Sequence, residues 1–218
     1  MPTMRWFPES LQKKSRIIVN AVNPAFFGVE RYPERGLIVT CGRLNEQKNH
    51  DMLIRSFLEV SKYHPHAKLH IYGEGALKNR LQELIDENNL NDKVELCGST
   101  NNVAGVLSRA SVFVMSSDYE GMPNALMEAM ASGVPCVSTD CPCGGPHMLI
   151  NDKINGLLVP VGDKVSLANA IQTLLSDTDY AEEIGKNAKG KAFEFSPDII
   201  FGEWRKYVDT IINPHAPR

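Results

Sequence analysis

The chain has 218 residues, of which 43% are hydrophobic and 22% charged, a composition typical of a globular domain that buries a proper core. Its 23 basic and 26 acidic residues give a formal net charge of -3, so we expect no nucleic-acid partner. No apolar run approaches the roughly 18 residues that span a bilayer, and the first residues lack the pattern of a secretory signal. Five cysteines, an odd number, are predicted to be reduced thiols in a cytoplasmic protein.

Short apolar, β-branched runs alternate with amphipathic stretches along most of the chain. The predicted strands are residues 36–44, 67–73, 93–98, 111–117, 134–139 and 156–160. The predicted helices are residues 49–65, 76–89, 102–110, 123–132, 164–177, 180–195 and 197–212. This strict alternation predicts an α/β fold, a doubly wound parallel sheet with helices on both faces, similar to the Rossmann fold.

The ends of the chain do not follow this alternation. Residues 1–35 are predicted to be a linker with one short first strand in the stretch "SRIIVNAVNPAFF". Residues 36–196 would form the sheet domain, and residues 197–218 a closing helix and tail.

Three loops that lead from a predicted strand into a helix are polar or rich in glycine. They read "GRLNEQKNH", "GEGALKNR" and "EGMPNALME". Ligands of open parallel sheets bind at such loops, outside the carboxyl ends of the strands. In the third loop, Gly121 and Pro123 come just before a helix, whose free amide groups would attract an anion.

The first loop contains two cations that would suit such an anion. Arg43 offers a forked contact to phosphate and Lys48 a mobile point charge, although each could also be a solvated surface side chain. Glu120 and Glu128 flank the third loop, and their carboxylates could accept hydrogen bonds from sugar hydroxyls. Each could instead be an exposed or helix-capping carboxylate.

Other candidate motifs are weaker. The segment "GEGALK" imitates a dinucleotide fingerprint, but Lys78 occupies the position of its third glycine. Cys136, Cys141 and Cys143 match no common zinc spacing. His64, His66 and His70 straddle a helix end and a strand, so we do not expect them to share a metal.

Taken together, these motifs resemble the carboxy-terminal half of the retaining glycosyltransferases of family 4, which have the GT-B fold. The pair Glu120 and Glu128 resembles that family's Glu-x7-Glu motif, and "GRLNEQKN" resembles its phosphate loop. The segments "LHIYGEG", "VELCG" and "ASVFVMSSDYEGMPNALMEAMASGVPCV" follow in the family's order. The similarity covers about residues 16 to 195.

The resemblance implies a site for a nucleotide-sugar donor, which we expect to be a UDP-sugar. Arg43 and Lys48 would neutralise the diphosphate, Glu120 would contact the transferred sugar, and Glu128 would hold the ribose. The remaining donor-binding positions implied are Gly42, Gly98, Ser99, Thr100, Gly121, Met122, Pro123, Asn124 and Ala125. No metal or other cofactor is expected, and no Asp-x-Asp motif is present.

The implied reaction transfers a hexose or N-acetylhexosamine to a glycan or lipid-linked acceptor in polysaccharide biosynthesis. Family members bind the acceptor through an amino-terminal domain, which this chain lacks, so we expect the chain alone to bind a nucleoside diphosphate without transferring sugar. The complete enzyme would be cytoplasmic or peripheral on the inner membrane face. Two alternatives are a noncatalytic nucleotide-sugar binding module and a GT-B nucleotide-sugar epimerase, which would convert the sugar without an acceptor.

Overall fold

The computed structural model describes residues 7–12, 15–142 and 144–212. Its centre is a six-stranded sheet in the order β3-β2-β1-β4-β5-β6, in which every neighbouring pair is parallel. The strands are β1 (Leu37–Cys41), β2 (Lys68–Tyr72), β3 (Val94–Gly98), β4 (Val112–Met115), β5 (Cys136–Thr139) and β6 (Leu157–Val159). This is the predicted doubly wound sheet, and all six strands lie within the predicted ranges.

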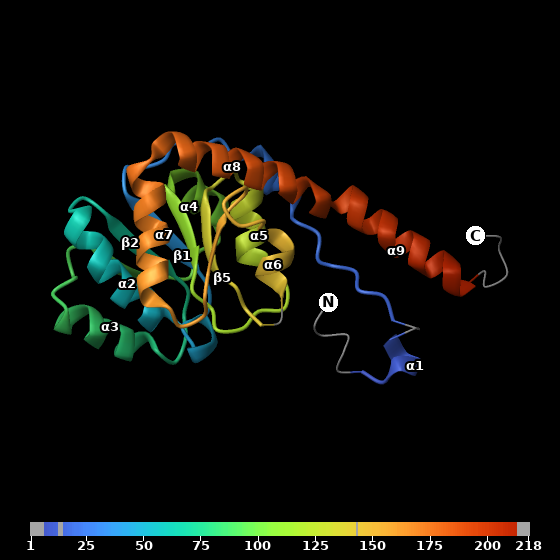
Figure 1. Cartoon of the computed structure of the whole chain (residues 1–218), viewed down its shortest axis with the longest axis horizontal. Coiled ribbons are helices and arrows are strands. Elements are labelled where there is room, and N and C mark those ends of the chain that lie inside the picture. Colours follow the sequence, from blue (N-terminus) through green and yellow to red (C-terminus); the bar gives the residue numbers. More distant parts are fainter. Residues whose placement is uncertain (1–6, 13–14, 143, 213–218) are drawn as a thin grey trace.

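Helices cover both faces of the sheet (Figure 1). One face carries α2 (His50–Tyr63), α3 (Lys78–Glu87) and α7 (Lys164–Ser176), whose apolar stripes share a core with alternate strand residues such as Ile38 and Val114. The other face carries α4 (Val103–Arg109), α5 (Asn124–Ala131) and α6 (Gly145–Leu149), with a core that includes Val39 and Phe113. Helix α8 (Thr178–Ala192) contributes to both cores.

The short first strand expected before residue 35 is wrong. The structure forms no strand in residues 15–35, where the chain runs as irregular backbone into a 3₁₀ turn, η2 (Pro24–Gly28). Both edges of β1 are already paired, with β2 and β4, so the segment cannot pair with the strand that follows it. It packs instead on the end of the chain, where the Val22 amide donates to the Phe195 carbonyl at 2.9 Å, within η4 (Phe193–Phe195).

Two helices lie at the ends of the described chain, α1 (Glu9–Gln12) and α9 (Pro197–Ile212). Figure 1 shows α9 extending away from the sheet domain. Ile200 is the buried residue of α9, whereas Phe201, Trp204 and Ile211 are exposed. Among the described residues, no helix combines the length and hydropathy needed to cross a membrane.

Candidate functional site

The carboxyl ends of β1 and β4 bring two of the three predicted loops together. The strands are parallel neighbours, with Ile38 opposite Val112, so the loops that follow them leave from the same end of the sheet. The loop after β1 includes the 3₁₀ turn η3 (Glu46–Lys48), and the loop after β4 leads into α5. Between them, the Asp118 amide donates to the Gln47 carbonyl at 2.8 Å.

Side chains join these two loops at three further points. Gln47 donates to the Tyr119 carbonyl at 2.9 Å, and Ser116 donates its hydroxyl to the Lys48 carbonyl at 2.9 Å. Asn49 donates to the Asp118 carboxylate at 2.7 Å, while its own side-chain oxygen accepts from the Met52 amide and caps α2. The sequence reasoning gave no role to Gln47, Asn49 or Asp118, although the first two flank the predicted Lys48. Their contacts hold the two loops in one arrangement.

Lys48 and Glu120, predicted from separate motifs, are in direct contact. The Lys48 Nζ lies 2.5 Å from Glu120 Oε1, and the Ser117 hydroxyl donates to the same oxygen at 2.9 Å. The two charged side chains are only 19% and 9% exposed, so the pair is largely removed from water. Oε2 of Glu120 takes part in neither contact. The arrangement therefore fixes the carboxylate while leaving one oxygen for another partner.

Gly42 allows Lys48 to reach this position. A Cβ atom at Gly42 would lie 3.1 to 3.4 Å from three methylene carbons of Lys48, so the lysine side chain passes directly over the glycine. Gly42 also approaches the second predicted loop, because a Cβ at Gly73 would lie within 1.8 Å of the Gly42 carbonyl oxygen. Gly73 thus serves close packing of two loops rather than a dinucleotide fingerprint.

Arg43 supplies a second cation at this corner. It follows β1 on the same edge of the sheet as the loop after β4, and it is exposed. Within the described part of the chain, its guanidinium has no ion pair or hydrogen bond. Its charge is therefore available to a ligand, whereas that of Lys48 is shared with Glu120.

The amino-terminus of α5 adds uncommitted amide groups. Its N-cap is Pro123, which offers no side-chain hydrogen bond, and the first helical hydrogen bond reaching back to it is donated by the Met127 amide at 3.1 Å. The amides of Asn124 and Ala125 precede that bond and so lack helical acceptors. Gly121 and Asn124 are exposed, Met122 and Ala125 are half-buried, and Pro123 is buried. An anion at this end of α5 would meet both donors and the positive end of the helix dipole.

Glu128, one turn further along α5, is half-buried, and this burial raises the pKa of its carboxyl group. Burial also raises the pKa of the Cys41 thiol to about 12, with a smaller contribution from the Glu128 charge. The charge of Glu128 therefore reaches the Cys41 thiol at the end of β1.

The predicted donor-binding positions Gly98, Ser99 and Thr100 lie at the end of β3 and in the loop that follows it. Gly98 has a φ of 70°, and its carbonyl accepts from the Gly73 amide at 2.8 Å. The Thr100 hydroxyl oxygen accepts from the Asn102 amide at 3.0 Å, and Ser99 is exposed. In the sheet β3 lies two strands away from β1, so this loop leaves from the same carboxyl end of the sheet at that distance from the Arg43 loop.

His50 follows the loop that carries Lys48 and is the first residue of α2. It is 2% exposed, and its buried Nδ1 atom makes no hydrogen bond with the residues that the structure describes. Burial, with a smaller contribution from Lys48, lowers the pKa of His50 to about 4.

We expect His50 to make the fold sensitive to acid. Because the pKa is lower in the folded state than the ordinary 6.5, its stabilising effect is complete above about pH 6.5 and is lost as the pH falls towards 4. The loss should reach about 3 kcal/mol. Urea unfolding at pH 7, 5.5 and 4.5 checks this: a His50→Leu chain should lose less stability than wild type, and a chain with the exposed His66 replaced by leucine should not differ from it. Equal acid losses in all three would contradict the assignment.

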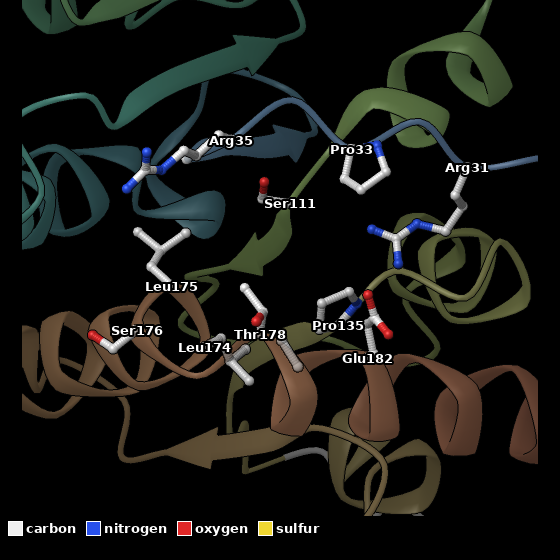
Figure 2. Close-up of a pocket in the computed structure, with 12 residues that line it drawn as sticks. Arg31, Pro33, Arg35, Ser111, Pro135, Leu174, Leu175, Ser176, Thr178 and Glu182 are labelled. Atoms are coloured by element: carbon white, nitrogen blue, oxygen red, sulfur yellow. The ribbon is translucent and has the colours of Figure 1, made fainter.

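A cavity of about 400 Å³ lies at the opposite end of the sheet, where the strands begin (Figure 2). Its lining includes Gly36, Ser111 and Pro135, which directly precede β1, β4 and β5. Figure 2 shows Arg31 pointing towards Pro135 and Glu182. The Arg31 guanidinium donates to the carbonyls of Gly133 and Ala110, each at 2.7 Å. The cavity is thus separate from the predicted site. Its Arg31 holds together the segments that come directly before β4 and β5.

Comparison with known proteins shows the family and the fold of the chain. The family model described as "Glycosyl transferases group 1" matches residues 23–191, and the chain belongs to this family. Its Rossmann-like sheet domain is shared with GT-B glycosyltransferases.

Two curated relatives and one solved structure illustrate the similarity. An uncharacterized glycosyltransferase of Methanocaldococcus jannaschii is 33% identical over 81% of this chain and 50% of its own length. N-acetylgalactosamine-N,N'-diacetylbacillosaminyl-diphospho-undecaprenol 4-alpha-N-acetylgalactosaminyltransferase of Campylobacter jejuni is 33% identical over 90% of this chain and 54% of its own. A mutant of S. aureus TarM, in complex with fondaparinux, alpha-GlcNAc-glycerol and UDP, has a TM-score of 0.80 at 27% identity, over 91% of this chain and 41% of its own. The chain spans about half the length of the curated relatives it matches.

Proposed function

We propose that this chain is the donor-binding half of a retaining glycosyltransferase that uses a UDP-hexose or UDP-N-acetylhexosamine. The observation that carries the proposal is the convergence of Lys48, Glu120 and the start of α5, which has no side-chain cap, at one corner, with the exposed Arg43 at the same end of the sheet. Family membership supports it, as does the UDP held by the TarM mutant, which is 27% identical to this chain.

In this proposal, the donor diphosphate lies between the cations and the amides around residues 121–125. Arg43 and Lys48 supply positive charge, and the amides of α5 supply hydrogen bonds, so no divalent metal is required for the transfer. The ribose hydroxyls bind Glu128, and the base lies against the loop from Gly98 to Thr100. The transferred sugar then meets Glu120, whose Oε2 accepts a hydrogen bond from a sugar hydroxyl.

The chemistry would follow from this placement. The acceptor hydroxyl attacks the anomeric carbon on the face from which the diphosphate departs, and the departing phosphate oxygen takes up the hydroxyl proton. Negative charge grows on the diphosphate as the bond breaks, so fixed cations and amides stabilise the transition state more than the ground state. Retention of configuration is the consequence of attack on that same face.

The acceptor would be held by a further domain of the complete enzyme. The exposed apolar side chains of α9, such as Phe201 and Trp204, would pack against that domain. The Campylobacter relative is named for a substrate linked to diphospho-undecaprenol, which supports a glycan or lipid-linked acceptor.

Calorimetric titration of the chain with UDP and with uridine tests the donor site. We expect an Arg43→Ala chain to bind UDP about tenfold or more weakly, because a charge-assisted contact contributes about 1.5–3 kcal/mol. Uridine, which lacks phosphate, should bind wild type and variant equally. Arg55→Ala is the matched control, since Arg55 is an exposed arginine of α2 paired with Asp51. Unchanged UDP affinity in Arg43→Ala would overturn the assignment of this residue.

A further inference from the structure

A second group of chemically reactive side chains lies at the outer edge of the sheet, on β2 and β3. One ligand atom each from His70, Glu95 and Cys97 lies within 4.8 Å of the others. His70 Nε2 and Glu95 Oε2 are 3.8 Å apart. The three residues take no part in the proposed donor contacts.

The strand register explains how three ligands from two strands converge. His70 pairs with Glu95, and Ile71 pairs with Leu96, but the next pair is Tyr72 with Gly98. Cys97 is therefore an extra residue on the edge strand, a bulge of the kind that redirects a side chain. Cys97, two residues after Glu95, thus lies in one cluster with Glu95 and with His70 of the neighbouring strand.

The surroundings largely bury His70 and leave Glu95 exposed. The His70 side chain is 17% exposed and meets the Tyr72 ring edge-on, with ring centroids 6.4 Å apart. The Glu95 side chain is 68% exposed. Bonds to zinc are about 2.0–2.3 Å long, so closing the three groups around an ion requires shifts of about 1 Å, which the exposed Glu95 can supply.

The chemistry of the three ligands favours a borderline-soft ion. Imidazole nitrogen, thiolate sulfur and carboxylate oxygen are together the ligand set of zinc, whereas magnesium and calcium prefer oxygen alone. Burial lowers the pKa of His70, which keeps its ring neutral and able to donate a lone pair to a metal. Burial and Glu95 raise the pKa of Cys97, so a metal has to displace its proton and should bind more tightly as pH rises.

Other charges near His70 partly cancel. Arg109 and Lys68 are positive, but Arg109 is paired with Glu34, its Nε lying 2.6 Å from the Glu34 carboxylate. Glu34 and Glu95 both favour positive charge at His70. The local field therefore does not exclude a divalent cation.

We propose that His70, Glu95 and Cys97 form a zinc-binding site on the edge of the sheet, with water completing the coordination. The ion links β3, the edge strand, to β2 immediately before Gly98. It thereby stabilises the strand from which the 98–100 loop departs.

Cobalt and zinc titrations of the metal-stripped, reduced chain test the site. Cobalt should produce a thiolate charge-transfer band in wild type, and one equivalent of zinc should abolish that band and raise the melting temperature. Cys97→Ser should lose the band. Because loss of even an outer partner costs about 10–100-fold in metal affinity, Cys97→Ser and His70→Asn should each weaken zinc binding by at least about 100-fold.

His66→Asn is the matched control, since His66 is exposed and lies outside the cluster. It should bind zinc as wild type does. Circular dichroism of each metal-free chain shows whether a variant is folded, so that a loss of binding is not a loss of structure. Absence of the thiolate band in wild type, or its persistence in folded Cys97→Ser, would overturn the proposal.

Discussion

Replacing Lys48 with methionine is expected to weaken UDP binding by about 10- to 100-fold. A charge-assisted hydrogen bond contributes about 1.5–3 kcal/mol, and methionine keeps most of the lysine's apolar length while removing its charge. The side chain would still pass over Gly42, so the shape of the loop is retained. Calorimetry with UDP measures the loss. Lys62→Met, at an exposed lysine of α2 paired with Glu59, should bind UDP as wild type does.

The same substitution should also destabilise the fold. Without Lys48, the carboxylate of Glu120 stays buried with only the Ser117 hydroxyl as a partner, and an uncompensated buried charge costs about 3 kcal/mol. A double variant, Lys48→Met with Glu120→Gln, should recover most of the unfolding free energy but not the UDP affinity. If the double variant recovered UDP affinity as well, Lys48 would act by holding the fold and not by contacting the diphosphate.

The sheet could be predicted because its signal is local. Each strand is a short apolar run, and each helix places apolar residues three or four apart, so the order of elements follows from periodicity alone. The one wrong strand, before residue 35, had the same β-branched composition. Such a segment can pair with the strand that follows it only if that strand has a free edge, and both edges of β1 are occupied, by β2 and β4. That is a property of the whole fold and not of the segment.

The site was only partly predictable, for a related reason. Parallel strands imply that loops after β1 and β4 meet at one edge, and the structure brings Lys48 and Glu120 into contact there. The sequence does not show that these two charges pair with each other, because they are 72 residues apart. It also does not show that Gln47 and Asn49 bind the opposite loop, since amide side chains carry no pattern that names a distant partner. The bulge at Cys97 was invisible for the same reason: register is set by pairing between strands.

Helix α6 was not predicted either, and it supports the strongest packing prediction. The stretch "CPCGGPHML" contains adjacent glycines and a proline, which are typical of a turn.

Cys143 lies outside the described residues, so the predicted absence of a metal at Cys136, Cys141 and Cys143 stays a prediction. No disulfide joins the four described cysteines, Cys41, Cys97, Cys136 and Cys141.

Gly145→Ala is expected to destabilise the fold by about 1–3 kcal/mol and to weaken UDP binding. A Cβ at Gly145 would lie 1.9 Å from the Gly121 carbonyl oxygen and 3.2 Å from the Pro123 ring. Both obstacles belong to the turn before α5, and one is backbone, so the turn or α6 has to move. Because that turn carries the amides proposed to bind the diphosphate, the displacement should reach the donor.

Gly190→Ala provides the opposite expectation in the same protein. Gly190 lies in α8, and a Cβ there would meet nothing within 4 Å, so alanine should stabilise the helix by about 0.5–1 kcal/mol and leave UDP affinity unchanged. Urea unfolding and calorimetry on both variants make the comparison. Equal stability in Gly145→Ala and wild type would mean that α6 yields freely, and the turn before α5 would then not be held rigid by its neighbour. The opposite signs are expected because a methyl group costs free energy only where backbone already fills its place.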